Sequence, residues 1–166
     1  MKPRHTAFIA AIIVAVFCTN GAQADSRIAR GKYLVDIIAC GDCHTPGGLT
    51  PKPDMKRYMA GSDAEFVMPG EGVFVPPNLT PDKATGIGTW TVDQIVAAIT
   101  TGVTPSGRVL SAAMPWPDFS HLSRPDALAI AVYLKSLPPV ANKVPDPASS
   151  RKGNGEALEL IYKRRR

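Results

Sequence analysis

The sequence predicts an all-α domain in which three main helices are joined by long loops. Three stretches, near residues 26–40, 91–102 and 123–137, carry apolar residues at helical spacing. The stretch between the first two is rich in Pro, Gly and Asp, and no segment alternates apolar and polar residues long enough to indicate a strand. The length of 166 residues fits one domain.

The first residues predict a secretory signal peptide. Lys2 and Arg4 precede twelve apolar or small residues, and Ala22-Gln23-Ala24 is a small-x-small cleavage site. A helix of twelve residues is about 18 Å long, which is too short to cross a bilayer. We therefore expect residues 1–24 to be removed after Ala24 and the mature protein to be periplasmic. An uncleaved N-terminal anchor is the alternative.

Each of the three helices has its own sequence signals. The first runs from Ser26 into the sequence CGDCH and has one apolar stripe. The second begins at Thr91, which forms a capping box with Gln94, and ends at Gly102. The third begins after Ser123, with a proline in its first turn, and stops before two consecutive prolines. Residues 45–76 are predicted to be loop.

The C-terminal residues differ from the body of the chain. We divide the chain into a signal peptide (1–24), a folded domain (25–140), and a Pro/Ser-rich linker with a basic tail (141–166). The last 24 residues hold seven Lys or Arg against three Asp or Glu, and EALELIYKRRR is expected to form one or two turns of amphipathic helix. The tail is interpreted as a docking element for an acidic partner or the membrane surface; a solvated, disordered tail is the alternative.

The strongest motif is C-x-x-C-H, formed by Cys40, Cys43 and His44. In an exported chain this is the attachment signature of a c-type haem, because two thiols can each bond a vinyl group while the histidine ligates the iron. A zinc site would need two more ligands, but after residue 24 only His121 remains. A thioredoxin-like dithiol would follow a strand, and a disulfide across so short a loop would stabilise little.

Four stretches resemble the class I c-type cytochromes, over roughly residues 26–140. They are RGKYLVDIIACGDCHTPGG, PPNLTPDKATGIGTWTVDQIVAAITTG, SAAMPWPDF and DALAIAVYLKSLPPV. The likeness is greatest to cytochrome c domains in the cytochrome subunits of bacterial dehydrogenases for alcohols, gluconate and related substrates. It implies one class I cytochrome c domain wrapped around a single, covalently bound haem c. Many of those subunits carry several haems, whereas this chain has one attachment motif.

The second iron ligand should be a soft neutral donor or another imidazole. Met114, followed by a proline, matches the family position for this ligand. Met55, Met59 and Met68 are interpreted as core filler. His121 would give a bis-histidine haem, but it lies beside the start of the last helix and is interpreted as a surface or capping residue.

The resemblance implies roles for further residues. The carbonyl of Pro77 should accept a hydrogen bond from the ring of His44, and Leu79 should pack on that ring. The indole N–H of Trp90 should reach a haem propionate, with simple core packing as the alternative. Gly31 should let the first helix cross closely under the last one.

An iron with one His and one Met ligand has no open position, so the predicted function is electron transfer and not catalysis. By resemblance, the donor is a dehydrogenase and the acceptor is another cytochrome or a terminal oxidase; no nucleic-acid partner is expected. Two alternatives stay open. Without Met114 as a ligand, the protein would be a five-coordinate haem protein that binds small gases or peroxide. Alternatively, it is a cytochrome subunit bound permanently in a dehydrogenase complex.

Overall fold

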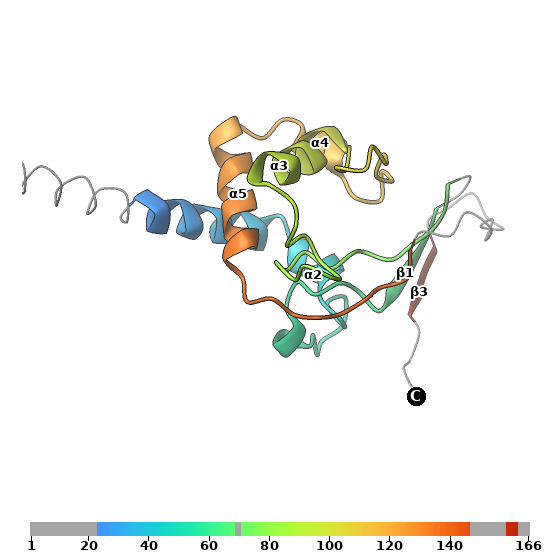
Figure 1. Cartoon of the computed structure of the whole chain (residues 1–166). Coiled ribbons are helices and arrows are strands. Elements are labelled where there is room, and N and C mark those ends of the chain that lie inside the picture. The colour runs from blue at the N-terminus through green and yellow to red at the C-terminus, as the bar shows by residue number, and fades with distance from the viewer. Residues whose placement is uncertain (1–22, 69–70, 147–158, 163–166) are drawn as a thin grey trace, which may run out of the picture.

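The computed structural model describes residues 23–68, 71–146 and 159–162 (Figure 1). A helix covers residues 23–37. It is followed by α2 (Cys40–His44), a short 3-10 helix (Met55–Arg57), β1 (Ala64–Met68), β2 (Gly72–Phe74), α3 (Val92–Thr101), α4 (Trp116–Phe119), α5 (Arg124–Ser136) and β3 (Glu159–Tyr162). The predicted signal peptide lies outside the described residues, apart from its last two positions.

The helix over residues 23–37 and α5 cross in close contact, as predicted. A Cβ placed on Gly31 would collide with the backbone carbonyl of Ala129 and would lie 2.7 Å from Cβ of Tyr133. Only glycine therefore permits this crossing. In Figure 1, α5 passes across the end of this helix, and α3 packs beside α5.

The two later helices begin and end near the predicted signals. Thr91 and Gln94 form the reciprocal capping box at the start of α3, and Gly102 ends it in the left-handed region with φ of 70°. The Ser123 side chain accepts a hydrogen bond from the backbone N–H of Asp126 at the start of α5. That helix ends at Ser136, before the two prolines.

The first predicted helix is interrupted before the CGDCH sequence. The helix over residues 23–37 stops, and Ala39 takes a left-handed backbone conformation with φ of 55° and ψ of 36°. The chain then re-enters a helix at Cys40. The expectation of one continuous helix was wrong, because the break has no glycine or proline to announce it.

The prediction of an all-α fold was incomplete, since the mostly helical chain also forms a small antiparallel sheet in the order β2-β1-β3. β1 and β2 lie within the stretch predicted to be loop and pair Phe66 with Phe74 and Val67 with Val73. Their aromatic and β-branched residues favour strands, but five and three residues are too few for a periodic pattern. The sheet lies on the opposite side of α2 from the helix over residues 23–37 (Figure 1).

The expected amphipathic helix near the C-terminus was also wrong at residues 159–162, which form β3. This strand pairs with the free edge of β1, with Ala64 opposite Tyr162 and Val67 opposite Glu159. An unpaired strand edge is a template for another strand, and this tertiary pairing overrides a weak local helix preference. The basic residues 163–166 lie outside the described residues.

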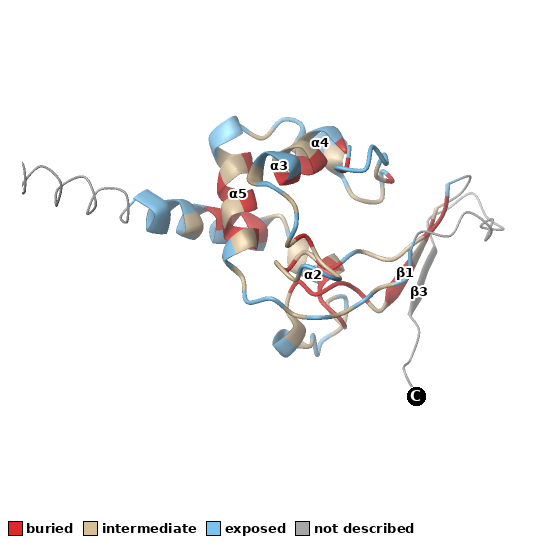
Figure 2. Cartoon of the chain, viewed as in Figure 1, coloured by how far each residue is buried: buried red, intermediate tan, exposed pale blue. Residues whose placement is uncertain are grey.

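The hydrophobic core lies where the three long helices meet and continues down to α2. Buried members include Leu34, Val35, Ile95, Ile99, Ile130 and Leu134. Figure 2 shows buried residues on α3 and α5 and in the loops around α2. In the described part of the chain, no helix has the length and apolar character needed to cross a membrane.

Candidate cofactor-binding site

The helix α2 carries the three predicted attachment residues on five consecutive positions. Cys40 and Cys43 are three residues apart, so their side chains lie on the same side of the helix. Both are half-buried free thiols. The chain leaves this helix at Thr45 in an extended conformation, immediately after His44.

The ring of His44 is held by one hydrogen bond, the one that the resemblance implies. Its Nδ1 lies 2.8 Å from the carbonyl oxygen of Pro77. Because a carbonyl can only accept, the proton is on Nδ1, and Nε2 keeps its lone pair for a ligand. The imidazole is buried, and this burial lowers its pKa. His44 is therefore a neutral imidazole with one fixed tautomer, which is the form that binds a metal ion.

The two thiols are not arranged as a reactive dithiol. Burial raises the pKa of the Cys40 thiol to about 11, and burial also raises the pKa of Cys43. A nucleophilic redox cysteine needs a lowered pKa. Among the described residues, no group of three or more His, Cys, Asp or Glu side chains could hold a metal ion. The burial of the two thiols thus does not favour the thioredoxin-like alternative.

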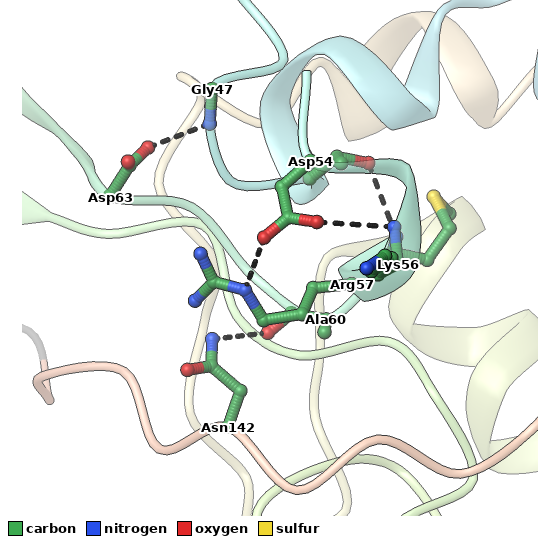
Figure 3. Close-up of polar contacts among 9 residues, drawn as sticks. Gly47, Asp54, Lys56, Arg57, Ala60, Asp63 and Asn142 are labelled. Carbon is green, nitrogen blue, oxygen red and sulfur yellow. Dashed lines mark hydrogen bonds and ion pairs between the residues drawn. The ribbon is translucent and has the colours of Figure 1, made fainter. Parts of the chain in front are cut away.

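The loop that follows α2 is fastened by side-chain hydrogen bonds that the sequence did not predict (Figure 3). The backbone N–H of Gly47 donates to Asp63 Oδ1 at 2.9 Å, and the guanidinium of Arg57 donates to Asp54 Oδ2 at 2.8 Å. The buried hydroxyl of Thr45 accepts from the N–H of Met59 at 3.1 Å. These bonds hold the loop, which contains the short 3-10 helix Met55–Arg57, in one conformation.

The methionines differ in their surroundings. Met59 is fully buried in the core, as predicted, whereas Met55 has 62% of its surface exposed, so its interpretation as core filler was wrong. Met68 is half-buried in β1. Met114 is half-buried on the loop just before α4, where its N–H donates to Ser111 at 3.0 Å and its carbonyl accepts from Trp116 at 2.6 Å.

The alternative ligand His121 lies on the surface. Its backbone N–H donates to the carbonyl of Asp118 at 3.2 Å, just before the capping residue of α5. These are the surroundings expected of a surface residue.

The two tryptophans, Trp90 and Trp116, differ in the hydrogen bonding of their indole N–H groups. Trp116 donates to the carbonyl of Leu110 at 3.2 Å and packs against Gly102, whereas sequence reasoning gave it no role. Trp90 is half-buried against the core, and its indole has no hydrogen-bond partner within the described residues. Lys135 holds the backbone at this point by donating to the carbonyls of Gly88 and Trp90. The indole of Trp90 thus has a donor available for a ligand.

The remaining predicted contact involves Leu79. This side chain is partly buried against the core, and its N–H donates to the carbonyl of Met59 at 2.8 Å. The segment from Pro77 to Leu79 is therefore adjacent to the loop that follows His44. Packing of Leu79 on the imidazole ring stays a prediction.

This donor set fits a covalently bound haem. Two unpaired thiols are three residues apart, a neutral imidazole follows with Nε2 free, and Met114 and Trp90 offer a soft donor and an unpaired N–H. Each is a group that a c-type haem uses.

Comparison with known proteins gives a consistent result. The chain is 36% identical over 112 residues to the fructose dehydrogenase cytochrome subunit of Gluconobacter japonicus, which covers 66% of this chain and 22% of the relative. It is 32% identical over 144 residues to the cytochrome c subunit of the quinone alcohol dehydrogenase of Gluconobacter oxydans, or 84% of this chain and 28% of that subunit. No family model matches.

A third relative is the gluconate 2-dehydrogenase cytochrome c subunit of Pantoea cypripedii, at 33% identity over 133 residues, which is 76% of this chain and 28% of the relative. The chain spans about a quarter of the length of these relatives. The predicted resemblance to class I c-type cytochromes is therefore confirmed, and the chain is homologous to part of the cytochrome c subunits of bacterial dehydrogenases.

Proposed function

We propose that the chain is a monohaem c-type cytochrome that carries single electrons. The observation that supports this most is α2, where Cys40 and Cys43 are free thiols and the next residue, His44, is buried, neutral and bonded through Nδ1 to Pro77. We propose thioether bonds at both cysteines, His44 as one iron ligand and Met114 as the other. The single attachment motif supports one haem per chain.

An iron held by one His and one Met has no open position and exchanges single electrons between its ferrous and ferric states. The chain's own residues would then orient and protect this group. Pro77 fixes the tautomer of His44, and the indole of Trp90 offers a hydrogen bond to a propionate. The chain would serve as an electron carrier and not as a catalyst.

The attachment can be tested on denaturing gels stained for haem. The Cys40→Ala/Cys43→Ala double variant should lose covalent haem and leave little or no stable holoprotein, because the haem would be a large part of the core. Cys18→Ala is a matched control, since that cysteine lies within the predicted signal peptide. Normal amounts of covalently bound haem in the double variant would rule out the proposal.

The site of action would be the periplasm, with the signal peptide cleaved after Ala24. The N-terminal sequence of the purified protein tests this directly. Asp25 as the first residue is the expected result, and a retained Met1 would favour an N-terminal anchor.

The donor would be a dehydrogenase, and the acceptor another cytochrome or a terminal oxidase. The names of the relatives support the donor, since each is a cytochrome subunit of a dehydrogenase. The same names favour a second candidate, a subunit bound permanently in such a complex. Co-purification separates the two candidates: a stable stoichiometric complex at high salt indicates a subunit, and a free cytochrome indicates a shuttle.

We also propose that the basic residues at the C-terminus guide docking. Four consecutive basic residues, 163–166, follow β3. Charges of this kind speed association with an acidic surface, and salt screens them over about 8 Å at physiological strength. Deletion of residues 163–166 should slow electron transfer from the physiological donor at low salt and leave the spectrum unchanged. A donor rate that is unaffected across a salt titration would make the tail a solvated extension.

A further inference from the structure

The chain after α5 does not leave the domain as a loose linker. Residues 140–144, which we call the C-terminal strap, belong to no helix or strand, with Val140, Asn142 and Val144 half-buried and the residues between them exposed. In Figure 1 the strap runs from the end of α5 past α2 toward the sheet. The predicted domain boundary at residue 140 falls at the start of this strap.

One side of the strap is bonded to the turn that follows Pro77. The buried side chain of Asn78 donates from Nδ2 to the carbonyl of Val140 at 2.7 Å, and the N–H of Val140 donates to Thr80 Oγ1 at 3.1 Å. The N–H of Asn142 donates to Thr85 Oγ1 at 3.0 Å. A buried amide satisfied in this way fixes the turn firmly, because leaving it unpaired would be costly.

The other side of the strap is bonded to the loop that follows α2. Asn142 Nδ2 donates to the carbonyl of Ala60 at 2.7 Å (Figure 3). Val144 covers the next residue: a Cβ added to Gly61 would lie 2.6 Å from Cγ1 of Val144. The strap therefore joins two segments that are far apart in the sequence.

Those two segments are the ones that hold His44. The N–H of Gly61 donates to the backbone carbonyl of His44 at 2.8 Å, and Pro77 accepts from its ring at 2.8 Å. The backbone of His44 is thus fixed by one segment and its imidazole by the other. The two segments are also bonded directly, by the N–H of Ser62 to the carbonyl of Pro76 at 3.0 Å and by the N–H of Leu79 to the carbonyl of Met59 at 2.8 Å, and the strap adds a further connection across them.

We propose that the strap positions the imidazole of His44, with Asn142 as the positioning residue. The proposal rests on the proposed function, in which His44 ligates the iron. A hydrogen bond at Nδ1 orients a ligating imidazole and raises its basicity. Loss of the strap's contacts would therefore weaken the bond between His44 and the iron without removing this ligand.

The test uses the reduced holoprotein, in which the Nδ1–H of His44 is followed by proton NMR. Asn142→Ala removes the bond to Ala60, and Asn142→Asp removes the donor while keeping the size of the side chain. In both variants the Nδ1–H resonance should move to lower frequency, and its exchange with solvent should accelerate by about threefold to tenfold, as expected for one weakened hydrogen bond. Amide protons of α5 should exchange as in the wild type.

Lys143→Ala is the matched control, since this strap residue is exposed and should change neither signal. The strap proposal is overturned if the Asn142 variants match this control, or if the amides of α5 accelerate by the same factor, which would indicate global destabilisation. The two proposals fail differently: wild-type protein without covalent haem would contradict the proposed function, whereas normal haem with an unchanged Nδ1–H would contradict only the strap.

Discussion

The surroundings of His44 and of Met114 are built in contrasting ways. Hydrogen bonds around His44 join residues far apart in the sequence: 33 positions for His44 to Pro77, 62 for Asn78 to Val140 and 82 for Asn142 to Ala60. Within the described residues, the hydrogen bonds of residues 102–116 stay inside residues 102–120. One proposed iron ligand is held by the whole fold, and the other by its own loop.

This difference indicates which side of the site can open. Local hydrogen bonds can break without disturbing the remaining structure, whereas long-range bonds break only when distant segments separate. The Met114 loop is therefore the side where a ligand would be lost or exchanged. The His44 side should stay intact until the domain unfolds.

The largest expected effect is on the Met114 side. Met114→Ala should abolish the weak long-wavelength absorption band of Met-to-iron charge transfer, lower the reduction potential and let the ferrous iron bind carbon monoxide. The reason is that residues 102–116 contain no other Met, His or Cys that could replace Met114 as a ligand. Absorption spectra and a redox titration of the holoprotein measure all three.

The matched control is Met59→Leu, which keeps the volume of a buried side chain and should cost less than about 1.5 kcal/mol. It should leave the band, the potential and the carbon monoxide response unchanged. A loss of the band in Met59→Leu, with the band retained in Met114→Ala, would reverse the ligand assignment.

The next largest expected effect is on the free energy of unfolding. It concerns two glycines with positive φ, Gly61 on the His44 side and Gly107 in the Met114 loop. Gly61 has φ of 95° and would place a Cβ 2.6 Å from Val144, whereas Gly107 has φ of 80° and open space around it. Gly61→Ala should lower the free energy of unfolding by about 2–4 kcal/mol, from backbone strain and overpacking together. Gly107→Ala should cost about 1 kcal/mol, from strain alone.

Chemical denaturation of the two holoproteins measures this difference. Equal costs would mean that Val144 moves aside at no cost, so that the strap packs only loosely over Gly61. A larger loss of stability in Gly107→Ala than in Gly61→Ala would contradict the expectation that the His44 side is the more tightly packed of the two.

The smallest expected effect is a loss of stability at acidic pH. Hydrogen bonds from the side chain and backbone of Thr85, and from the N–H of Ala84, hold the pKa of Asp82 below its usual range. A carboxyl whose folded pKa is lowered stabilises the fold above its unfolded pKa of about 3.9, and this contribution is lost as the pH falls through the folded value. Thr85 also binds the strap, so this acid sensitivity belongs to the His44 side.

The Tm of Asp82→Asn should therefore be lower than that of the wild type near pH 7, and the difference in Tm should shrink below about pH 4. Asp118→Asn, on α4, is the control from the other side, since residues 102–116 contain no acidic residue. If the difference in Tm between the wild type and Asp82→Asn were the same at all pH values, the charge of Asp82 would not be the source of its contribution to stability.

The sequence predicted most of what is encoded locally. The capping box at Thr91, the end of α3 at Gly102 and the cap at Ser123 are statements about neighbouring residues, and all three are confirmed. The bond between His44 and Pro77 joins distant residues, and it was predicted only because a family pattern carries it.

The features that were missed depend on tertiary partners. Asn142 stands in a Pro-rich stretch that is typical of a linker, and its role becomes visible only when Ala60 lies beside it. Similarly, β3 forms because β1 offers a free edge, although the residues of this segment also suit a helix. The left-handed conformation of Ala39 has no sequence signal at all, since alanine favours helix.

The strap also sets an order of assembly. Contacts between residues far apart in the chain form late, because the entropic cost of closing a long loop comes before these contacts can stabilise the fold. Asn142 follows Ala60 by 82 positions, so the enclosure of His44 is completed only after α5 has been synthesised and has folded. Until then the loop that follows Cys40 and Cys43 is not yet held by the strap.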